Sequence, residues 1–253
     1  MKLKSIAAML FIIGLVLAGC SNQKQSDSKS KEQTLHVAAA ASLTDVTKDL
    51  EQAFKKQHPD AKVTFNYGGS GALRQQIEKG APVDVLMSAN KKDVQALKDK
   101  KQADHVYDYA KNNLVLIGEK GTKAKSVKDL KPGDKLAIGE VKSVPAGKYA
   151  ESYLKANGLY NGVQDQLVFA KDVRQVLNYV AKGNAQLGFV YQTDLYQNKT
   201  KSDKVKAIQQ VQLKEPIVYE AGTTSDNQLG KAWIEFLKSD EAKKILRAYH
   251  FEA

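Results

Sequence analysis

The chain has 253 residues and a formal net charge of +11, and 42% of its residues are hydrophobic. This length allows one large domain or two moderate ones with a buried core. A single cysteine excludes a disulfide framework and a cysteine-rich metal site. The lysines are spread along the chain without interleaved aromatic residues, so the charge favours a solvated surface that attracts anions over a nucleic-acid interface.

The first twenty residues predict a targeting segment. Lys2 and Lys4 precede the apolar stretch IAAMLFIIGLVLAG, which is short for a membrane span and typical of a signal peptide over 1–19. The stretch ends in LAGC, which resembles the bacterial lipobox and implies lipidation of Cys20. Residues 20–33 then read as the lipidated cysteine and a polar, flexible tether. The sequence therefore predicts an extracytoplasmic protein, lipid-anchored to the cell membrane and distant from nucleic acid.

Short apolar strands alternate with amphipathic helices from residue 34 onward, which predicts an α/β fold with largely parallel sheets. LHVAAAA is a strand, and the helix that follows has Ser42 at its N-cap and Asp45 three residues later in a pair resembling a capping box. The strand–turn–helix unit then recurs through KVTFNY, DVLMSA, KLAIGE and QLVFA, with Asp172 as a later N-cap, and AQLGFVY adds a strand. The last helical stretch, 226–250, is long enough to be two helices broken near Ser239.

Small residues and a hydroxyl mark several junctions between strands and helices. These junctions are AAAAS (38–42), GGSG (68–71) and VPAG (144–147). Ligands of such folds bind at the carboxyl ends of strands, where helix N-termini offer free N–H groups to anions. Small side chains let an oxyanion approach the backbone, so the junctions predict a neutral, donor-lined cradle for a small anion.

Six stretches in order resemble the molybdate-binding proteins of bacterial ABC importers. They are AAASLTD, YGGSGALRQQIEKGAPVDVLMSA, NNLVLIG, LAIGE with VPAGKYA, DVRQVL and LGFVYQTD, and the resemblance as a whole covers nearly all of residues 35–251. The resemblance implies a two-lobed type II periplasmic-binding fold with the ligand cleft between the lobes. It also implies a solute-binding protein without enzymatic activity or cofactor, which captures molybdate or tungstate and delivers it to membrane permease and ATPase subunits. A monomer is expected.

The resemblance further implies five residues that bind the oxyanion, with no protein ligand to the molybdenum itself. Ser42 and Ser70 would donate hydroxyl and backbone N–H bonds. Ala146 and Val173 would donate backbone N–H bonds, and Tyr191 its phenolic O–H. The sequence agrees independently with four of them, because each falls at a strand-to-helix junction. Glycines flank Ser70 where some members of the family have a run of serines, so fewer hydroxyls stand nearby.

Two crossings of the chain predict the lobes. A crossing near 112–118 and a return near 215–222 would place 34–113 with 217–253 in one lobe and 114–216 in the other. Ser42 and Ser70 would then face the other three donors, and closure would be a hinge motion.

Several alternatives stay open at this level. Ser42 could be only a cap, Ser70 only a turn residue and Tyr191 only a core aromatic. GGSGA also resembles a nucleophile elbow, which would make Ser70 the nucleophile of a serine hydrolase with His250 as the late histidine. Sulfate, phosphate or a small organic anion could replace molybdate as cargo, and molybdate and tungstate are too similar to separate. No histidine pair or cysteine cluster has metal-ligand spacing, so Asp84, Asp172 and Asp194 are interpreted as caps and solvated acids.

Overall fold

The computed structural model describes residues 33–253, which form two five-stranded sheets flanked by helices. The predicted signal peptide, Cys20 and nearly all of the tether lie outside these residues. In the first sheet the strand order is β2-β1-β3-β12-β4, and in the second it is β11-β5-β8-β6-β7. No helix within 33–253 is long and apolar enough to cross a membrane.

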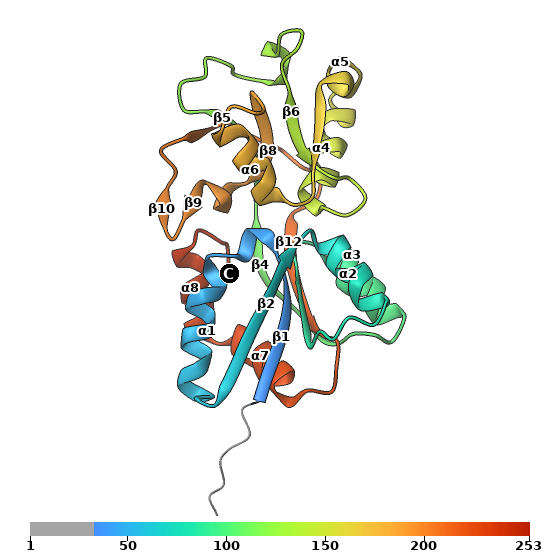
Figure 1. Cartoon of the computed structure of the whole chain (residues 1–253), viewed down its shortest axis with the longest axis vertical. Helices are drawn as coiled ribbons and strands as arrows, with labels where there is room; N and C mark the ends of the chain where they lie inside the picture. Colours follow the sequence, from blue (N-terminus) through green and yellow to red (C-terminus); the bar gives the residue numbers. More distant parts are fainter. Residues whose placement is uncertain (1–32) are drawn as a thin grey trace, which may run out of the picture. The chain divides into compact units, whose positions relative to one another are not determined.

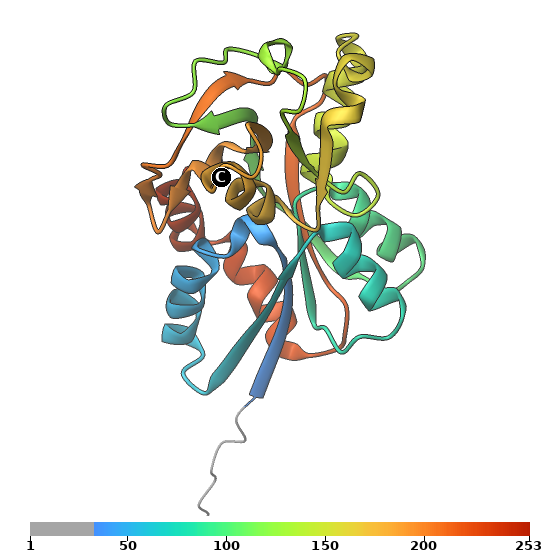
Figure 2. The ribbon, with the colours of Figure 1, turned by 45° about the horizontal axis from the view of Figure 1, so that its top comes forward.

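The first sheet carries helices on both faces (Figures 1 and 2). α2 and α3 pack on one face, and α1, α7 and α8 lie on the other. The strands are β1 (Gln33–Ala40), β2 (Ala61–Gly68), β3 (Val85–Ser88), β4 (Asp104–Asn112) and β12 (Ile217–Thr223). The helices are α1 (Val46–Gln57), α2 (Ser70–Glu78), α3 (Lys91–Asp99), α7 (Gln228–Lys238) and α8 (Asp240–Ala248), and the 3-10 turn η1 (Ala41–Leu43) follows β1.

The second sheet is covered by α4 and α6, both of which pack against β6 and β8. Its strands are β5 (Leu114–Glu119), β6 (Leu136–Gly139), β7 (Leu167–Ala170), β8 (Leu187–Tyr191) and β11 (Val205–Gln210). The helices are α4 (Pro145–Ala156), α5 (Tyr160–Val163) and α6 (Val173–Ala181). The 3-10 turns η2 (Val127–Asp129), η3 (Gln164–Gln166) and η4 (Gln192–Leu195) and the hairpin of β9 (Tyr196–Gln197) and β10 (Thr200–Lys201) complete it.

Four of the five strands in each sheet run in the same direction, as predicted, and one strand in each, β12 or β5, runs against them, which makes both sheets mixed. β1 pairs in parallel with β2 and β3, and β6 pairs in parallel with β7 and β8, as the strand–helix units require. The pairings of β12 with β3 and β4, and of β5 with β8 and β11, are antiparallel. These antiparallel strands flank the two connections between the sheets, where the chain leaves one sheet and later returns, so they run against their neighbours.

An aromatic cluster fills the core beneath the first sheet. Trp233 is fully buried and packs edge-on against Phe54 and Phe65, with ring centroids 5.1 and 6.0 Å apart. Burial of such side chains contributes about 1.5–3 kcal/mol each, which is how a chain without a disulfide can hold its fold. The long C-terminal helix is broken as predicted, because Ser239 ends α7 and its side chain caps α8.

Strand register brings the two predicted serines to one edge of the first sheet. Ala40, the last residue of β1, pairs with Gly68, the last residue of β2. Ser42 and Ser70 each follow two residues later, so both leave the carboxyl end of a parallel pair side by side. The chain passes from β4 to β5 through Asn113 and returns from β11 to β12 through 211–216.

Candidate functional site

All five predicted donors are buried at the carboxyl ends of strands or the beginnings of helices. Ser42 lies in η1, Ser70 and Val173 are the first residues of α2 and α6, Ala146 is the second residue of α4, and Tyr191 ends β8. None of the five is more than 3% exposed. The first N–H groups of a helix have no intrahelical acceptor, so Ser70, Ala146 and Val173 bring such donors.

The starts of α2, α4 and α6 converge where the two lobes meet. The Gly71 N–H in α2 donates to the Ser143 carbonyl just before α4 at 3.0 Å. A β-carbon at Gly69 would lie 2.7 Å from that same oxygen and 3.1 Å from the Lys171 carbonyl before α6. η1, which contains Ser42, packs against α6. The structure therefore brings the helix starts of both lobes to one seam.

Ser42 does not have the predicted capping role. It is the middle residue of η1, while α1 begins at Val46 after Asp45, and the Asp45 side chain makes no cap bond. A 3-10 turn lies between strand and helix, so the helix begins later than the alanine run suggests. The Ser42 hydroxyl instead contacts the Tyr219 hydroxyl at 2.9 Å.

The Asn112 side-chain amide supports Tyr219 by donating to its hydroxyl oxygen at 3.2 Å. Either hydroxyl can be the donor in the bond between Ser42 and Tyr219, and when Tyr219 donates, the Ser42 proton is available for a ligand. Sequence analysis missed Tyr219 and Asn112 as supporting groups, although both lie in the crossing stretches that it singled out.

Ser70 keeps its hydroxyl proton. Its oxygen accepts the Ala89 N–H at 3.0 Å, and the side chain is fully buried. Because the oxygen is the acceptor in this bond, the hydroxyl can still donate. Both serines are thus held in place by neighbours from the same lobe.

Tyr191 has a buried hydroxyl without a hydrogen-bond partner in the structure. Burial raises the pKa of Tyr191 well above its ordinary value, so the hydroxyl stays protonated and can form hydrogen bonds only in its neutral state. Its ring packs edge-on against Tyr219, with centroids 5.7 Å apart, which places it beside the group that orients Ser42. An unsatisfied buried hydroxyl costs about 1–3 kcal/mol, and a ligand oxygen would remove that cost.

Arg174, the residue after Val173, lies between a carboxylate of the other lobe, Asp45, and a carboxylate of its own lobe, Asp194. Its Nη2 lies 2.9 Å from Asp45 Oδ2, and its Nε lies 3.0 Å from Asp194 Oδ1. Neither oxygen has a well-aligned hydrogen bond, so the attraction is that of an ion pair. Asp194 is fully buried and not the solvated acid that was predicted. Burial raises its pKa to about 6, against the opposing effect of Arg174.

The alternative of a serine hydrolase finds no support in the geometry. The Ser70 oxygen is occupied by the Ala89 N–H, and the His250 ring stacks on Tyr196 with centroids 3.7 Å apart. No hydrogen bond joins this serine to a histidine among the residues that the structure describes. Within 33–253, no group of three or more histidine, cysteine, aspartate or glutamate side chains could hold a metal ion.

Known solute-binding proteins match this chain over nearly its whole length. The model of the family described as bacterial extracellular solute-binding protein matches residues 35–252. YvgL of Bacillus subtilis, whose name assigns it to an ABC transporter as a substrate-binding lipoprotein, is 36% identical over 251 residues, covering 94% of each chain. The molybdate-binding protein ModA of Haemophilus influenzae is 33% identical over 266 aligned positions, covering 100% of this chain and 99% of its own.

A solved structure confirms the two-lobed type II periplasmic-binding fold. The periplasmic molybdate-binding protein of Azotobacter vinelandii superposes with a TM-score of 0.77 at 26% identity, over 87% of this chain and 99% of its own. Both the sequence relatives and the fold are those of solute-binding proteins rather than enzymes, as predicted. The chain therefore belongs to the bacterial extracellular solute-binding protein family.

Proposed function

We propose that this chain binds molybdate between its lobes, and tungstate by the same contacts, and delivers it to the permease and ATPase subunits of an ABC importer. The observation that carries the proposal is the unpartnered, buried hydroxyl of Tyr191. The helix starts that meet at the lobe seam and the Ser70 hydroxyl, which keeps a proton to donate, support it. Two relatives named molybdate-binding proteins, one in sequence and one in structure, support it.

The donors suit a fully deprotonated dianion. Hydroxyl and N–H donors stabilise oxyanion oxygens without an opposing charge. Arg174, which follows Val173, is already engaged by Asp45 and Asp194, so its charge is largely neutralised within the protein. Phosphate carries a proton near neutral pH and needs an acceptor, whereas both nearby carboxylates are committed to the arginine. This favours molybdate, tungstate or sulfate over phosphate as the cargo.

In this proposal the lobes are 34–113 with 217–253, and 114–216, and they hinge at the two connections between the sheets. Cys20 carries the lipid that holds the protein at the outer face of the cell membrane, and 20–33 is the tether. The protein acts as a monomer without a resident cofactor.

A panel of oxyanions tests the identity of the cargo. Molybdate, tungstate, sulfate and phosphate at equal concentration should raise the melting temperature in proportion to the logarithm of concentration over Kd. The largest shifts are expected for molybdate and tungstate, because sulfate is smaller. A larger shift with sulfate or phosphate would refute molybdate as the cargo.

Tyr191→Phe tests the site itself, because it should act in opposite directions on stability and on binding. Without ligand, removal of an unpartnered hydroxyl should leave the melting temperature unchanged or higher. Calorimetric affinity for molybdate should fall by about 5- to 150-fold, the equivalent of one buried donor. Ser70→Ala should weaken binding similarly, but it also frees the Ala89 N–H and should lower stability. Wild-type affinity in Tyr191→Phe would remove Tyr191 from the site.

A further inference from the structure

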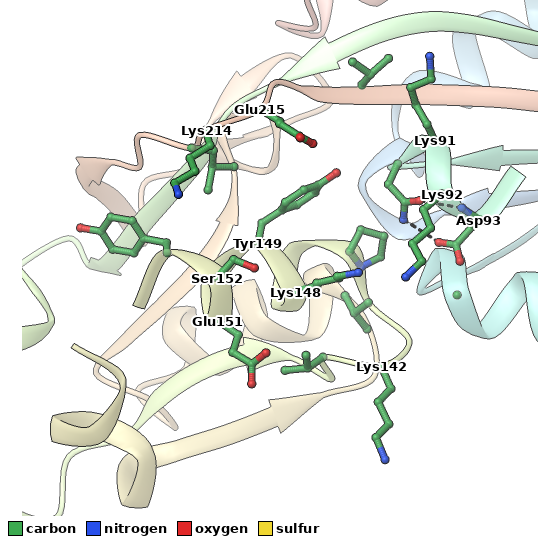
Figure 3. Close-up of a pocket in the computed structure, with 18 of the residues that line it drawn as sticks. Lys91, Lys92, Asp93, Lys142, Lys148, Tyr149, Glu151, Ser152, Lys214 and Glu215 are labelled. Carbon is green, nitrogen blue, oxygen red and sulfur yellow. Dashed lines mark hydrogen bonds between the residues drawn. The ribbon is translucent and has the colours of Figure 1, made fainter. Parts of the chain in front are cut away.

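A second cleft lies beside the oxyanion site and contains none of the five donors. It has a volume of about 1040 Å³ and lies between α3, α4 and the returning segment 211–216 (Figure 3). Gly71 and Ser143, which meet at the lobe seam, form part of its wall. The cleft thus borders both lobes and a connection between them, and its volume is at the upper end of the range for small-molecule pockets.

The charged side chains around this cleft leave an excess of positive charge. Arg74 is paired with Asp93 and Glu78, Lys91 with Asp108, and Glu151 with Lys155. Among the described residues, four lysines of the lining have no carboxylate within 4.0 Å: Lys92, Lys142, Lys148 and Lys214. Glu215 is the one lining carboxylate outside these pairs. Unpaired ammonium groups in a concave site attract anions.

Two of the unpaired lysines approach each other across the lobes. Lys92 is on α3 of the first lobe and Lys148 on α4 of the second, and their ammonium groups point into the same space (Figure 3). The proximity of Lys92 lowers the pKa of Lys148, with a further contribution from burial. Bringing the lobes together therefore costs repulsion between like charges. An anionic group between the two ammonium groups would turn that repulsion into attraction.

The walls between the lysines are apolar and aromatic. The Tyr149 ring reaches into the cleft between Glu215 and Lys148 (Figure 3). Burial raises the pKa of Tyr149 to about 12, so its hydroxyl is a neutral donor. Tyr153, Leu213 and Pro216 line the same cleft. Such walls suit a planar or apolar body, whereas a bare inorganic anion would leave them in contact with water.

We propose that this cleft is a second binding site, for a small organic anion with carboxylate or phosphate groups on a planar body. The anionic groups lie between Lys92 and Lys148, and the body lies against Tyr149. Occupancy favours the closed lobes, because the site takes one lysine from each lobe. Because coupling between two binding sites is reciprocal, the organic anion then tightens binding of the oxyanion, and the oxyanion tightens binding of the organic anion by the same factor. This coupling rests on the proposed function, whereas binding in the cleft does not.

Calorimetry on the full chain tests the site with benzene-1,2,4-tricarboxylate as the probe. Saturable binding is expected without molybdate, with inorganic phosphate binding at least about tenfold more weakly for lack of a planar body. Lys92→Met and Lys148→Met should each weaken binding of the probe by about fivefold or more. Lys98→Met, an exposed lysine of α3 that does not line the cleft, should leave it unchanged. Saturating probe should tighten molybdate binding by about fivefold or more in the wild type only.

The outcomes separate the two proposals. If the probe shows no saturable binding up to roughly 5 mM, its binding free energy is too small for a specific site, and the second site is overturned. Equal affinity for phosphate and the tricarboxylate, or equal losses in Lys98→Met, also overturns it, because the lysines would then act only as general surface charge. If the probe binds as expected and molybdate does not, the second site stands and the proposed cargo is wrong. If molybdate binds and the probe has no effect on it, the coupling is overturned.

Discussion

A methyl group at Gly69 should prevent the lobes from closing. A β-carbon there would lie 2.7 Å from the Ser143 carbonyl oxygen, 2.9 Å from a methyl of Val144 and 3.1 Å from the Lys171 carbonyl, where ordinary contacts begin at 3.4 Å. All three neighbours belong to the connections of the second lobe that precede α4 and α6, and two of the atoms are backbone oxygens that cannot swing aside. The lobes must therefore separate by about half an ångström or more at the seam, and this separation breaks the hydrogen bond from the Gly71 N–H to the Ser143 carbonyl.

The cost should appear in binding rather than in folding. Overpacking of this kind costs about 1–3 kcal/mol, which corresponds to roughly a 5- to 150-fold increase in the molybdate Kd. The backbone of Gly69 has φ −66° and ψ 131°, which alanine adopts without strain, so the first lobe should melt close to the wild-type temperature. Calorimetry gives the Kd, and small-angle scattering of the ligand-free protein should show a larger radius of gyration.

Gly68→Ala is the matched control for this prediction. The nearest atom to its β-carbon is a Leu73 methyl of the same lobe at 3.4 Å, which is an ordinary contact. Its molybdate affinity should stay within about twofold of the wild type. If Gly69→Ala also binds molybdate within twofold and scatters like the wild type, the seam is not the surface that closes, and the reasoning fails.

Three further changes follow from the same contacts. Asp45→Asn removes the inter-lobe partner of Arg174 and should raise the molybdate Kd, measured by calorimetry, by about 5- to 30-fold. The control, Asp49→Asn, breaks a more exposed ion pair and should change the Kd by less than about threefold. Equal effects of the two variants would contradict an ion pair that holds the lobes together. Asp194 has its pKa raised to about 6 by burial, so its protonated form favours the fold, and this contribution is complete below about pH 4 and lost as the pH rises through 6. The melting temperature of the wild type relative to that of Asp194→Asn should rise as the pH falls from 8 to 4. A difference in melting temperature that does not change with pH would contradict the raised pKa of Asp194. Gly147→Ala places a methyl on the backbone carbonyl of Gly139 inside the second lobe and should cost ~3 kcal/mol or more in urea unfolding; wild-type stability would show that α4 can move away from β6.

Local sequence patterns determined the elements and their order. The apolar strands, the helix stops and the break at Ser239 follow from side-chain type and from capping, which act within a few residues. The same local chemistry agrees with four of the five donors that the family resemblance implies, because a small residue or a hydroxyl after a strand marks a strand-to-helix junction. Sequence could also indicate the family, through motifs in a fixed order, and the comparisons confirm it.

Tertiary structure decided what these junctions meet. The register that places Ala40 opposite Gly68 sets the two serines side by side, and no local signal carries that pairing. The one antiparallel strand in each sheet follows from the two connections between the lobes. Asp194 is buried because η4 packs inside the fold, whereas a sequence pattern that considers each acidic residue alone predicts that it is exposed to solvent. Ser42 is not a cap because a 3-10 turn precedes α1, and its hydroxyl instead contacts that of Tyr219, 177 residues further on. Periodicity and capping are short-range effects, whereas burial, charge pairing and the seam at Gly69 depend on atoms that only the folded chain brings together.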